Sequence, residues 1–378
     1  MGKIMVSVLC ITYNQVMYIE EALKGILSQK TDFPYEIIIH DDASTDGTTD
    51  IVRKYEKEYP DTVRAVIQKE NQFSRGVRIT EQLLGMEAKG KYAAFCEGDD
   101  YWTDQYKLQK QVDYMERHEG CTLCFHNVKE RDMRTGKVKD VWRFDKRVYR
   151  GEGSYSAEET IKLKVVPTVS MLFRRKDVMS IPDLYSDKIK YGDMIKTMCL
   201  GAKGYSYCMK DTMAVYRTGI NNSIMDICTQ SLEKYNNRYL GAVETLENID
   251  AYTQGIYNSV LAEAMKEYRE KLLVFNEEGV ERLASRVKKI LIYGAGQYAK
   301  WCSICMENKQ MSVNGYVVSE KGKKPDNYLG KKVYGLDEIC GWKDMGIVIG
   351  VSALYRDEII ENLRAKQIDN YCLGIIKM

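Results

Sequence analysis

The sequence has little of what marks membrane-spanning, disordered or exported chains. Its 378 residues include only 5 prolines, and its 28 glycines form no collagen-like repeat. No apolar run approaches the ~18 residues that a membrane span needs. The N-terminal MGKIMVSVLC lacks the longer apolar region and cleavage site of a signal peptide. We therefore expect a cytoplasmic protein, and peripheral attachment to the inner face of a membrane stays open.

The chain also lacks an excess of charge of either sign. Lys and Arg number 56 and Asp and Glu number 54, which gives a net charge of +2. This balance gives no support for nucleic-acid binding, which usually needs a basic domain. Only 3 histidines are present, so a multi-histidine metal site is not expected. The hydrophobic share of 44% is ordinary for a soluble globular protein and can supply a substantial core.

The 11 cysteines are odd in number and spread along the whole chain. Without an export signal, we expect reduced and mostly buried thiols. Two pairs have CxxC spacing, Cys121–Cys124 and Cys302–Cys305, and four thiolates could hold zinc. The first pair lies in a strand pattern and the second in an apolar helix pattern, so we expect neither a metal nor a redox role.

Short apolar runs alternate with amphipathic stretches along the first third of the chain. The pattern predicts strands at residues 5–13, 36–40, 63–68, 91–96 and 121–128, and helices at 18–27, about 45–59, 79–88 and 104–119. Ser44 or Thr45, and Thr103, are the expected caps of two of these helices. Strands alternating with helices predict a mostly parallel sheet with helices on both faces. The apolar run EIIIH is typical of a parallel strand buried on both sides.

The rest of the chain divides into three further patterns. A hairpin turn at 134–137, a mobile loop at 143–153, a capping box of Ser156 and Glu159, and late strands at 169–173 and 214–216 are expected first. Residues 226–286 read as two or three helices without a clear strand, and a second small α/β unit begins at about residue 287. We therefore predict domains at 1–225 and 287–378, joined by a helical segment at 226–286.

Acidic residues gather where the predicted strands end. Ligands bind beyond the carboxyl ends of strands in open parallel sheets, and five carboxylates would converge there: Asp41, Asp42, Glu97, Asp99 and Asp100. Like charges packed together repel, so a divalent cation with oxygen ligands is the economical explanation. Asp and Ser also serve as turn and cap residues, and for Ser44 and Asp46 that alternative stays open.

These motifs resemble those of a known family. TYN after the first strand, DDASTDGT after the second and EGDDYWTDQYKLQKQ after the fourth are similar to inverting family 2 glycosyltransferases of the GT-A fold, of the bacterial polysaccharide-assembly type. The similarity continues in order through TVSMLFRR at 168–175, YGDMIKTMCLGAKG at 191–204 and DTMAVYR at 211–217. The resemblance implies an α/β GT-A domain that transfers a sugar from a nucleotide-diphosphate donor to a saccharide or lipid-linked acceptor in surface polysaccharide biosynthesis.

The resemblance also implies residue roles. The residues that would bind the nucleotide sugar are Thr12, Tyr13, Asn14, Asp41, Asp42, Glu97 and Asp99. Glu97 and Asp99 occupy the acidic places of the family's D-x-D motif, where Mg²⁺ or Mn²⁺ bridges the diphosphate. Either Asp99 or Asp100 would be the direct metal ligand. Asp193 matches the catalytic base.

Other positions would border the donor or acceptor pocket: Tyr101, Trp102, Ser170 and Arg217. Arg217 could pair with phosphate or form a structural salt bridge. The chain departs from the family in two places. The histidine that often follows the Tyr-Arg pair is absent, and Ala43 replaces the commonest glycine of the DDGS motif.

The second unit carries Gly294-Ala295-Gly296 after an apolar strand, and Glu320 after the next strand. This fits G-x-G-x-x-A at the start of a helix and is similar to small Rossmann-like domains of sugar-modifying proteins. Its glycines could cradle a nucleotide or only allow tight strand–helix packing.

Two other functions stay open from sequence. One is an NAD-dependent oxidoreductase that uses the C-terminal domain, and the other is a non-catalytic sugar-nucleotide-binding module. The sequence contains no motif that identifies the donor sugar, the nucleotide, the acceptor or the oligomeric state.

Overall fold

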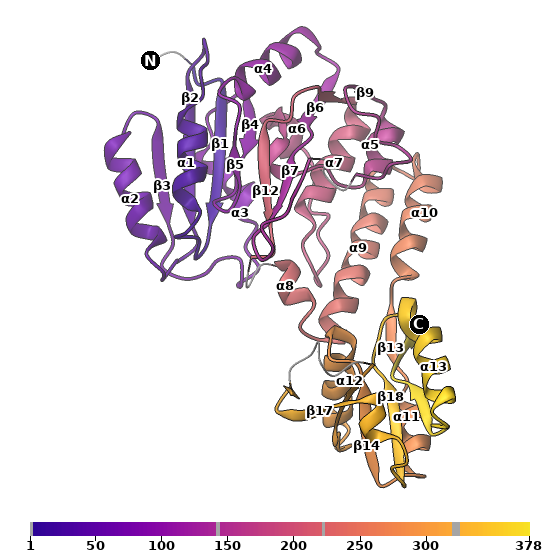
Figure 1. Ribbon diagram of the computed structural model, residues 1–378. Helices are drawn as coiled ribbons and strands as arrows, with labels where there is room; N and C mark the ends of the chain where they lie inside the picture. The colour runs from indigo at the N-terminus through magenta and orange to yellow at the C-terminus, as the bar shows by residue number, and fades with distance from the viewer. Residues whose placement is uncertain (1–2, 141–143, 221–223, 320–325) are drawn as a thin grey trace. The chain divides into compact units, whose positions relative to one another are not determined.

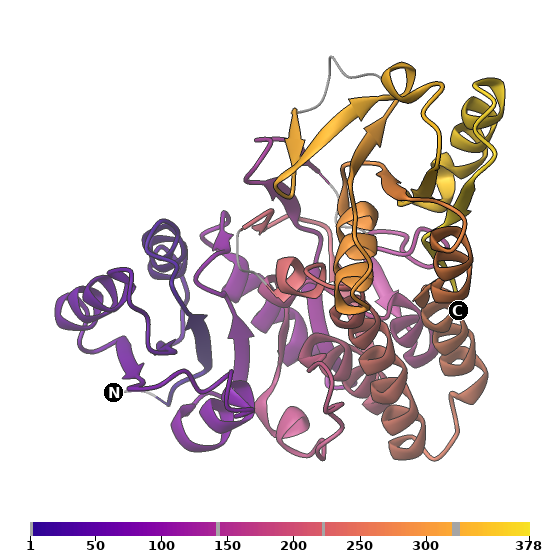
Figure 2. The same ribbon diagram turned by 90° about the horizontal axis from the view of Figure 1, so that it is seen from below.

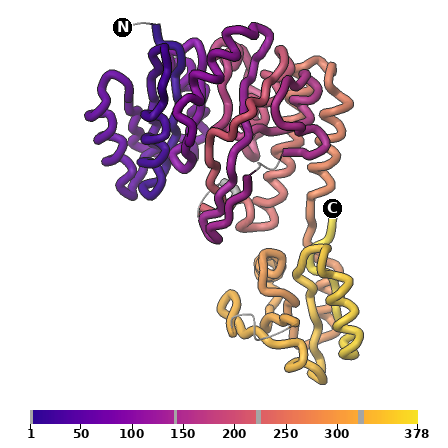
Figure 3. Tube along the Cα trace, turned by 45° about the horizontal axis from the view of Figure 1, so that its top comes forward, coloured from indigo at the N-terminus to yellow at the C-terminus, as the bar shows by residue number. Residues whose placement is uncertain are grey.

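The structure is a computed structural model and describes residues 3–140, 144–220, 224–319 and 326–378. The chain divides into two units, traced in Figures 1 and 3: Met1–Asn221 with Gly241–Met265, and Asn222–Leu240 with Lys266–Met378. The division falls within two helices, α9 (Leu232–Tyr252) and α10 (Asn258–Arg269). The domain limits at residues 225 and 286 stay a prediction.

An eight-stranded sheet forms the frame of the first unit, in the order β3-β2-β1-β4-β10-β6-β11-β9. Its members are β1 (Val6–Thr12), β2 (Tyr35–Asp41), β3 (Val63–Ile67), β4 (Tyr92–Phe95), β6 (Cys121–His126), β9 (Gly153–Tyr155), β10 (Leu172–Arg174) and β11 (Tyr205–Met209). Strands β1 to β4 are parallel to their neighbours within that group. Strand β10 is antiparallel to both β4 and β6, so the parallel sheet expected from the sequence continues as a mixed one.

Helices cover both faces of this sheet, as expected. On one face pack α1 (Ile19–Leu27), α2 (Thr48–Glu58) and α4 (Lys107–Arg117). On the other pack α3 (Ile79–Gln82), α5 (Ala157–Leu163), α6 (Arg175–Met179) and α7 (Gly192–Lys203). Strand β2 explains the EIIIH run, because Ile37 and Ile39 enter the first core and Ile38 the second. Alternate side chains of a strand point to opposite faces, so a strand between two helical layers is apolar throughout.

A smaller four-stranded sheet has the order β5-β12-β7-β8. Its strands are β5 (Tyr101–Trp102), β7 (Lys129–Asp132), β8 (Val138–Lys139) and β12 (Ala214–Thr218). The antiparallel β7–β8 pair confirms the hairpin expected at 134–137, where Gly136 takes a left-handed φ of 70°. Strand β12 runs antiparallel to β5, and this pairing positions the residues that follow β4.

The second unit contains a six-stranded sheet in the order β16-β17-β15-β14-β18-β19. Its strands are β14 (Lys289–Tyr293), β15 (Gly315–Val318), β16 (Asn327–Tyr328), β17 (Lys331–Gly335), β18 (Met345–Ile349) and β19 (Tyr371–Leu373). Every neighbouring pair in this sheet is parallel except β16 and β17, which are antiparallel. The sheet lies between helices, as Figure 2 shows: α11 (Glu277–Ala284) and α12 (Gln297–Asn308) on one face and α13 (Arg356–Ala365) on the other.

Some local predictions were wrong for identifiable reasons. Gly47 and Tyr106 occupy the N-cap positions of α2 and α4, in place of Ser44 or Thr45 and Thr103. In both turns an aspartate side chain accepts a hydrogen bond from a backbone amide. The Thr48 amide donates to Asp46 Oδ1 at 3.0 Å, and the Tyr106 amide donates to Asp104 Oδ1 at 2.8 Å. The capping box of Ser156 and Glu159 at α5 is confirmed.

The helical segment also differs from expectation. It holds α8 (Ile224–Cys228), α9, α10 and α11, and it includes a strand, β13 (Leu273–Phe275), that pairs with β20 (Ile375–Lys377). A strand of three residues has no readable periodicity, and its partner lies a hundred residues further on. The predicted helix at 79–88 is also divided, because α3 passes into a π-helical turn at Leu83–Glu87.

The structure bears on two expectations from the sequence, the state of the cysteines and the presence of membrane-spanning segments. All 11 cysteines are free and 8 of them are buried, with the CxxC pairs on β6 and α12. Among the described residues, no helix is both long and apolar enough to cross a membrane. Residue 143 of the loop expected to be mobile lies outside the described residues, and within the loop Phe144 is buried and stacks on Tyr149.

Candidate functional site

Three polar segments meet at one edge of the larger sheet. Thr12 at the end of β1 pairs in register with Asp41 at the end of β2. The amide of Asp42 donates to the Thr12 carbonyl at 3.0 Å, and the amide of Gly98, beyond β4, donates to the Ile11 carbonyl at 3.0 Å. The convergence expected from parallel strands is therefore present.

Asp41, the last residue of β2, and Asp42, which follows it, are buried and bonded to their own chain. Asp41 accepts from the Ser44 amide at 3.0 Å and from the Thr49 hydroxyl. Asp42 accepts from the amides of Gln72 at 2.6 Å and Phe73 at 3.0 Å. Asp42 thereby ties the loop after β3 to the site, and Asp41 holds the turn that leads into α2.

Asn14 joins the segment after β1 to the turn after β2. Its amide donates to Ser44 Oγ at 2.9 Å, and its Oδ1 accepts from the Thr45 amide at 2.8 Å. Asn14 and Ala43 both have left-handed φ angles, 52° and 64°. Glycine is favoured in this region, so a glycine at position 43 would take this conformation with less strain than Ala43. Tyr13, next to Asn14, is 47% exposed.

The acidic segment after β4, Glu97–Asp100, forms a tight turn against β1, the acidic turn. The Asp100 amide donates to the Glu97 carbonyl at 3.0 Å. A Cβ on Gly98 would lie 2.6 Å from Thr12 Oγ1 and 2.4 Å from Gln15 Oε1. Only glycine fits between the two acidic positions, because any side chain would displace Thr12 and Gln15.

Arg217 reaches this turn through the β5–β12 pairing. Val215 is opposite Tyr101 in the antiparallel register, so the continuing strand brings Arg217 beside Asp99. Its amide donates to Asp100 Oδ1 at 2.9 Å, and its Nη1 donates to the Asp99 carbonyl at 2.6 Å. Its Nη2 pairs with Glu21. The sequence left a phosphate role and a structural salt bridge open for Arg217. The structure contains the salt bridge, to Glu21, and the phosphate role stays a prediction.

The acidic turn is strained electrostatically. Burial, together with the charges of Asp99 and Asp193, raises the pKa of Glu97 to about 8. Burial also raises the pKa of Asp99, and burial with the neighbouring carboxylates raises the pKa of Asp100. Asp100 Oδ2 is buried and has no hydrogen-bond partner. Buried carboxylates in this condition favour protons or a cation.

Asp193 is the second residue of α7, which lies in the first unit with the acidic turn. Its charge raises the pKa of Glu97, and it also acts on Tyr216, whose pKa is raised by burial and by four carboxylates: Asp100, Glu97, Asp99 and Asp193. Asp193 therefore lies near enough to the acidic turn for its charge to act on Glu97, although it is 94 residues from Asp99 in the sequence.

The other predicted pocket residues lie around the turn. The Tyr101 ring is 4.5 Å from the Arg217 guanidinium. Trp102 is buried and donates from Nε1 to the Val169 carbonyl at 3.0 Å. Ser170 is buried and donates to the Pro167 carbonyl at 2.7 Å. Trp102 and Ser170 therefore support the strand ends from within.

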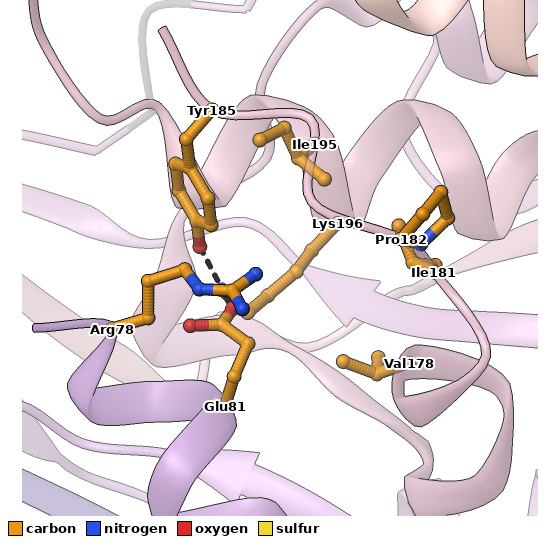
Figure 4. Close-up of a pocket in the computed structure, with 8 residues that line it drawn as sticks. All are labelled: Arg78, Glu81, Val178, Ile181, Pro182, Tyr185, Ile195 and Lys196. Carbon is orange, nitrogen blue, oxygen red and sulfur yellow. Dashed lines mark hydrogen bonds and ion pairs between the residues drawn. The ribbon is translucent and has the colours of Figure 1, made fainter. Parts of the chain in front are cut away.

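A pocket next to α7 contains residues that the sequence analysis missed. Figure 4 shows the residues that line it: Arg78, Glu81, Val178, Ile181, Pro182, Tyr185, Ile195 and Lys196. Lys196 is buried, and its charge lowers the pKa of Glu97 against the larger effect of burial. The position of Lys196 one helical turn after Asp193 was a readable signal, but nothing in the sequence indicated Glu81 or Tyr185.

The donor chemistry of the acidic turn fits a divalent cation. Among the described residues, no three His, Cys, Asp or Glu side chains are grouped so that they alone could hold a metal ion. Mg²⁺ commonly takes only one or two carboxylates and completes its shell with water and substrate phosphate. The unpartnered Oδ2 of Asp100 and the carboxylate of Asp99 can supply such ligands.

Comparisons with known proteins place parts of the chain in known families. The glycosyl transferase family 2 profile matches residues 7–181, and the "C2185-like, N-terminal" profile matches residues 286–373. Rv1520 of Mycobacterium tuberculosis is 34% identical over 245 residues, which cover 64% of this chain and 66% of Rv1520. TuaG of Bacillus subtilis, named as a teichuronic acid biosynthesis glycosyltransferase, is 30% identical over 228 residues, 59% of this chain and 82% of TuaG.

A solved structure shows the same fold. S. aureus TarS 1–349, in complex with UDP-GlcNAc, aligns with a TM-score of 0.52 and 20% identity over 71% of this chain and 72% of that one. The larger unit has the GT-A fold of nucleotide-sugar transferases. The chain belongs to glycosyltransferase family 2, a family of transferases. The chain spans about two thirds of the length of Rv1520.

Proposed function

We propose that this protein transfers a sugar from a nucleotide-diphosphate donor to a saccharide or lipid-linked acceptor, with inversion, in surface polysaccharide biosynthesis. The convergence of the Glu97–Asp100 turn and Asp193 at the carboxyl edge of the larger sheet supports this most strongly. Family membership and the similarity to TuaG support the pathway class.

The donor would lie along the ends of β1, β2 and β4. Thr12, Asn14 and Asp41 shape the edge of the nucleotide site, and Asp42 fixes the loop after β3 that borders it. Tyr13 is exposed beside them and can contact the base. Glu97 and Asp99 face the position of the diphosphate.

Asp99 and Asp100 would hold Mg²⁺ or Mn²⁺ together with the diphosphate. When bound, the cation offsets the negative charge that develops on the leaving diphosphate. Arg217 keeps the turn in shape by bonding the Asp99 carbonyl and Asp100 Oδ1. Because Oδ1 is used in this way, Oδ2 of Asp100 is the oxygen available to a ligand.

Asp193 would act as the general base. A carboxylate that removes the proton of the acceptor hydroxyl strengthens its attack on the sugar C1. Attack on the face opposite the leaving diphosphate inverts the anomeric configuration, and the reaction passes through an oxocarbenium-like state as in glycoside hydrolysis. Asp193 is the second residue of α7, and its charge acts on Glu97 in the acidic turn where the donor diphosphate would lie.

For the second unit we propose an accessory, Rossmann-like role. Its parallel strands have the order β17-β15-β14-β18-β19, which is the order of nucleotide-binding α/β sheets. The residues that we assign as catalytic base, as metal ligands and as donor-binding residues all lie in the first unit.

A ligand screen tests the donor assignment. Thermal unfolding of the full chain should be followed with UDP, GDP, dTDP and CMP, each with and without Mn²⁺. Binding to the folded state raises the melting temperature, so at least one nucleoside diphosphate should give a shift that Mn²⁺ enlarges. In Asp100→Asn the Mn²⁺-dependent part should disappear. An unchanged Mn²⁺ effect in that variant would contradict the assignment.

A further inference from the structure

Gly192 lies directly before Asp193, and two polar side chains close over it. A Cβ on Gly192 would lie 3.0 Å from Lys196 Nζ and 3.0 Å from the Tyr185 hydroxyl. Nζ of Lys196 also donates to the Gly192 carbonyl at 3.3 Å. The first turn of α7 is therefore enclosed by Tyr185 and Lys196 at the residue that precedes Asp193.

One carboxylate joins these two side chains. The Tyr185 hydroxyl donates to Glu81 Oε1 at 2.7 Å, and Lys196 Nζ lies 3.6 Å from the same oxygen. Figure 4 shows Tyr185, Lys196 and Arg78 gathered around Glu81. Burial raises the pKa of Glu81, but the charge of Lys196 and the hydrogen bond from the Tyr185 hydroxyl lower it by more. The pKa of Glu81 is therefore lowered, and its carboxylate stays ionised.

The same lysine faces the acidic turn. Lys196 is only 4% exposed, and its Nζ lies 5.5 Å from the ring centroid of Phe95, two residues before Glu97. Its charge acts on Glu97, and Asp193 in turn acts on both Glu97 and Tyr185. One buried cation thus lies among Glu81, Glu97 and Asp193.

A gain in folding stability does not by itself account for the pair of Glu81 and the buried Lys196. Replacing a buried ion pair by apolar residues of similar volume is often neutral or stabilising. The wall of the pocket includes Val178, Ile181 and Ile195, so an apolar pair in place of both Glu81 and Lys196 would have apolar neighbours.

We propose that Glu81, Tyr185 and Lys196 form a brace that positions Asp193 against the acidic turn. They are positioning residues: Glu81 on α3 holds Tyr185 and Lys196, and these two fix the peptide of Gly192 and so the direction of the Asp193 side chain. Lys196 also supplies the positive charge that allows Asp193 and Glu97 to lie close together. This inference rests on the proposed transfer reaction.

The test compares turnover and local order in matched variants of the full chain. Lys196→Met should lower kcat at least tenfold with the donor KM changed less than threefold, and Tyr185→Phe should lower kcat by a smaller factor. The double variant should be little worse than Lys196→Met, because residues of one network are not additive. Lys203→Met is the control: it is on the same helix, but its Nζ bonds Ser180 outside the brace, so kcat should not change.

A charge swap separates positioning from simple pairing. Glu81→Lys with Lys196→Glu keeps an ion pair between α3 and α7 but places a negative charge beside Glu97 and Asp193, so it should not restore kcat. Restored kcat in the swap, or kcat within twofold of wild type in Lys196→Met, would overturn the proposal.

Hydrogen exchange gives a readout that needs no activity. Amides of residues 191–195 should exchange faster in Lys196→Met and Tyr185→Phe than in wild type or Lys203→Met, and unchanged exchange would also overturn the brace. If the wild type releases no nucleoside diphosphate from any donor, the proposed function fails, and this exchange measurement still decides whether the brace exists.

Discussion

The backbone amide of Arg217 donates to Oδ1 of Asp100 at 2.9 Å, although 117 residues separate the two. The β5–β12 register creates this contact, and the guanidinium adds a bond to the Asp99 carbonyl at 2.6 Å. One residue from a late strand therefore holds both aspartates of the acidic turn.

Removal of the Arg217 side chain should loosen this turn. Arg217→Met loses the charged bond to the Asp99 carbonyl, worth about 1.5–3 kcal/mol. It also loses the pair with Glu21, which is half exposed and therefore screened by solvent, so that this pair adds little. We expect an unfolding free energy lower by about 2–3 kcal/mol and at least tenfold weaker nucleotide binding in Mn²⁺, measured by denaturant titration and calorimetry. Arg117→Met, at a residue exposed on α4, is the control and should change neither quantity. Wild-type nucleotide affinity in Arg217→Met would argue against the turn as the donor site.

Because Oδ2 of Asp100 is buried without a hydrogen-bond partner, replacement of Asp100 should have opposite effects on stability without and with Mn²⁺. Burial and the neighbouring carboxylates raise the pKa of Asp100, so its ionised form is unfavourable without a cation. Asp100→Asn should therefore raise the melting temperature in EDTA at neutral pH, yet abolish the part of the nucleotide stabilisation that depends on Mn²⁺. Donor turnover should stop in EDTA and return with Mn²⁺ or Mg²⁺. Full turnover in EDTA would exclude the metal-assisted reaction.

The buried amine of Lys107 gives a pH dependence of stability. Burial lowers its pKa from 10.5 to about 7, with Cys96 and Cys124 acting weakly in the other direction. Between these values the unfolded chain binds more protons than the folded one, so stability should rise with pH. Relative to Lys107→Met, the unfolding free energy of the wild type should increase from pH 6.5 to pH 9, by at most about 1.4 kcal/mol per pH unit.

Lys110→Met on the same helix is the control for this titration. Lys110 is partly exposed and paired with Asp104 and Asp211, and its pKa is raised by its hydrogen bonds, so it should add no slope between pH 6.5 and pH 9. A wild-type stability parallel to that of Lys107→Met across this range would contradict the lowered pKa of Lys107.

Two glycines of the second unit should respond differently to the same substitution. Gly294 has a φ of 116°, and its Cβ would lie 2.8 Å from the Gly350 carbonyl, whereas a Cβ on Gly296 meets nothing within 4 Å. Gly294→Val should therefore destabilise the second unit and Gly296→Val should not, as measured by hydrogen exchange of β14 and β18. Neither should stop sugar transfer. Loss of donor binding in Gly294→Val, with the first unit folded, would move the donor site to the second unit.

The sequence was sufficient for the elements that have strong local patterns. The EIIIH run, the TYN and DDAST segments and the E-G-D-D turn indicated parallel strands with polar ends at one edge, and β1, β2 and β4 confirm this. Gly98 shows why the motif is so compact, because a side chain there would clash with Thr12. The GT-A fold followed from the order of these motifs.

Contacts between distant segments could not be predicted in the same way. Arg217 has no local signal for its role, since its bonds to the acidic turn depend on the register of β12 with β5. The contact of Glu81 with Lys196 depends on how α3 and α7 pack on one face of the sheet. The short strand β13 forms only because β20 lies beside it. The roles of the site residues themselves stay predictions for experiment.

The release of nucleoside diphosphate by wild type and Asp193→Asn tests the central claim most directly. The full chain should be incubated with Mn²⁺, a saccharide acceptor panel and the nucleotide sugar whose nucleotide gives the largest thermal shift. Asp187→Asn, at an exposed position shortly before α7, is the matched control. We expect Asp193→Asn to release product about 10²–10⁴-fold more slowly, because the acceptor hydroxyl loses its general base, with nucleotide affinity unchanged and Asp187→Asn equal to wild type. Equal rates in Asp193→Asn and wild type would contradict the account.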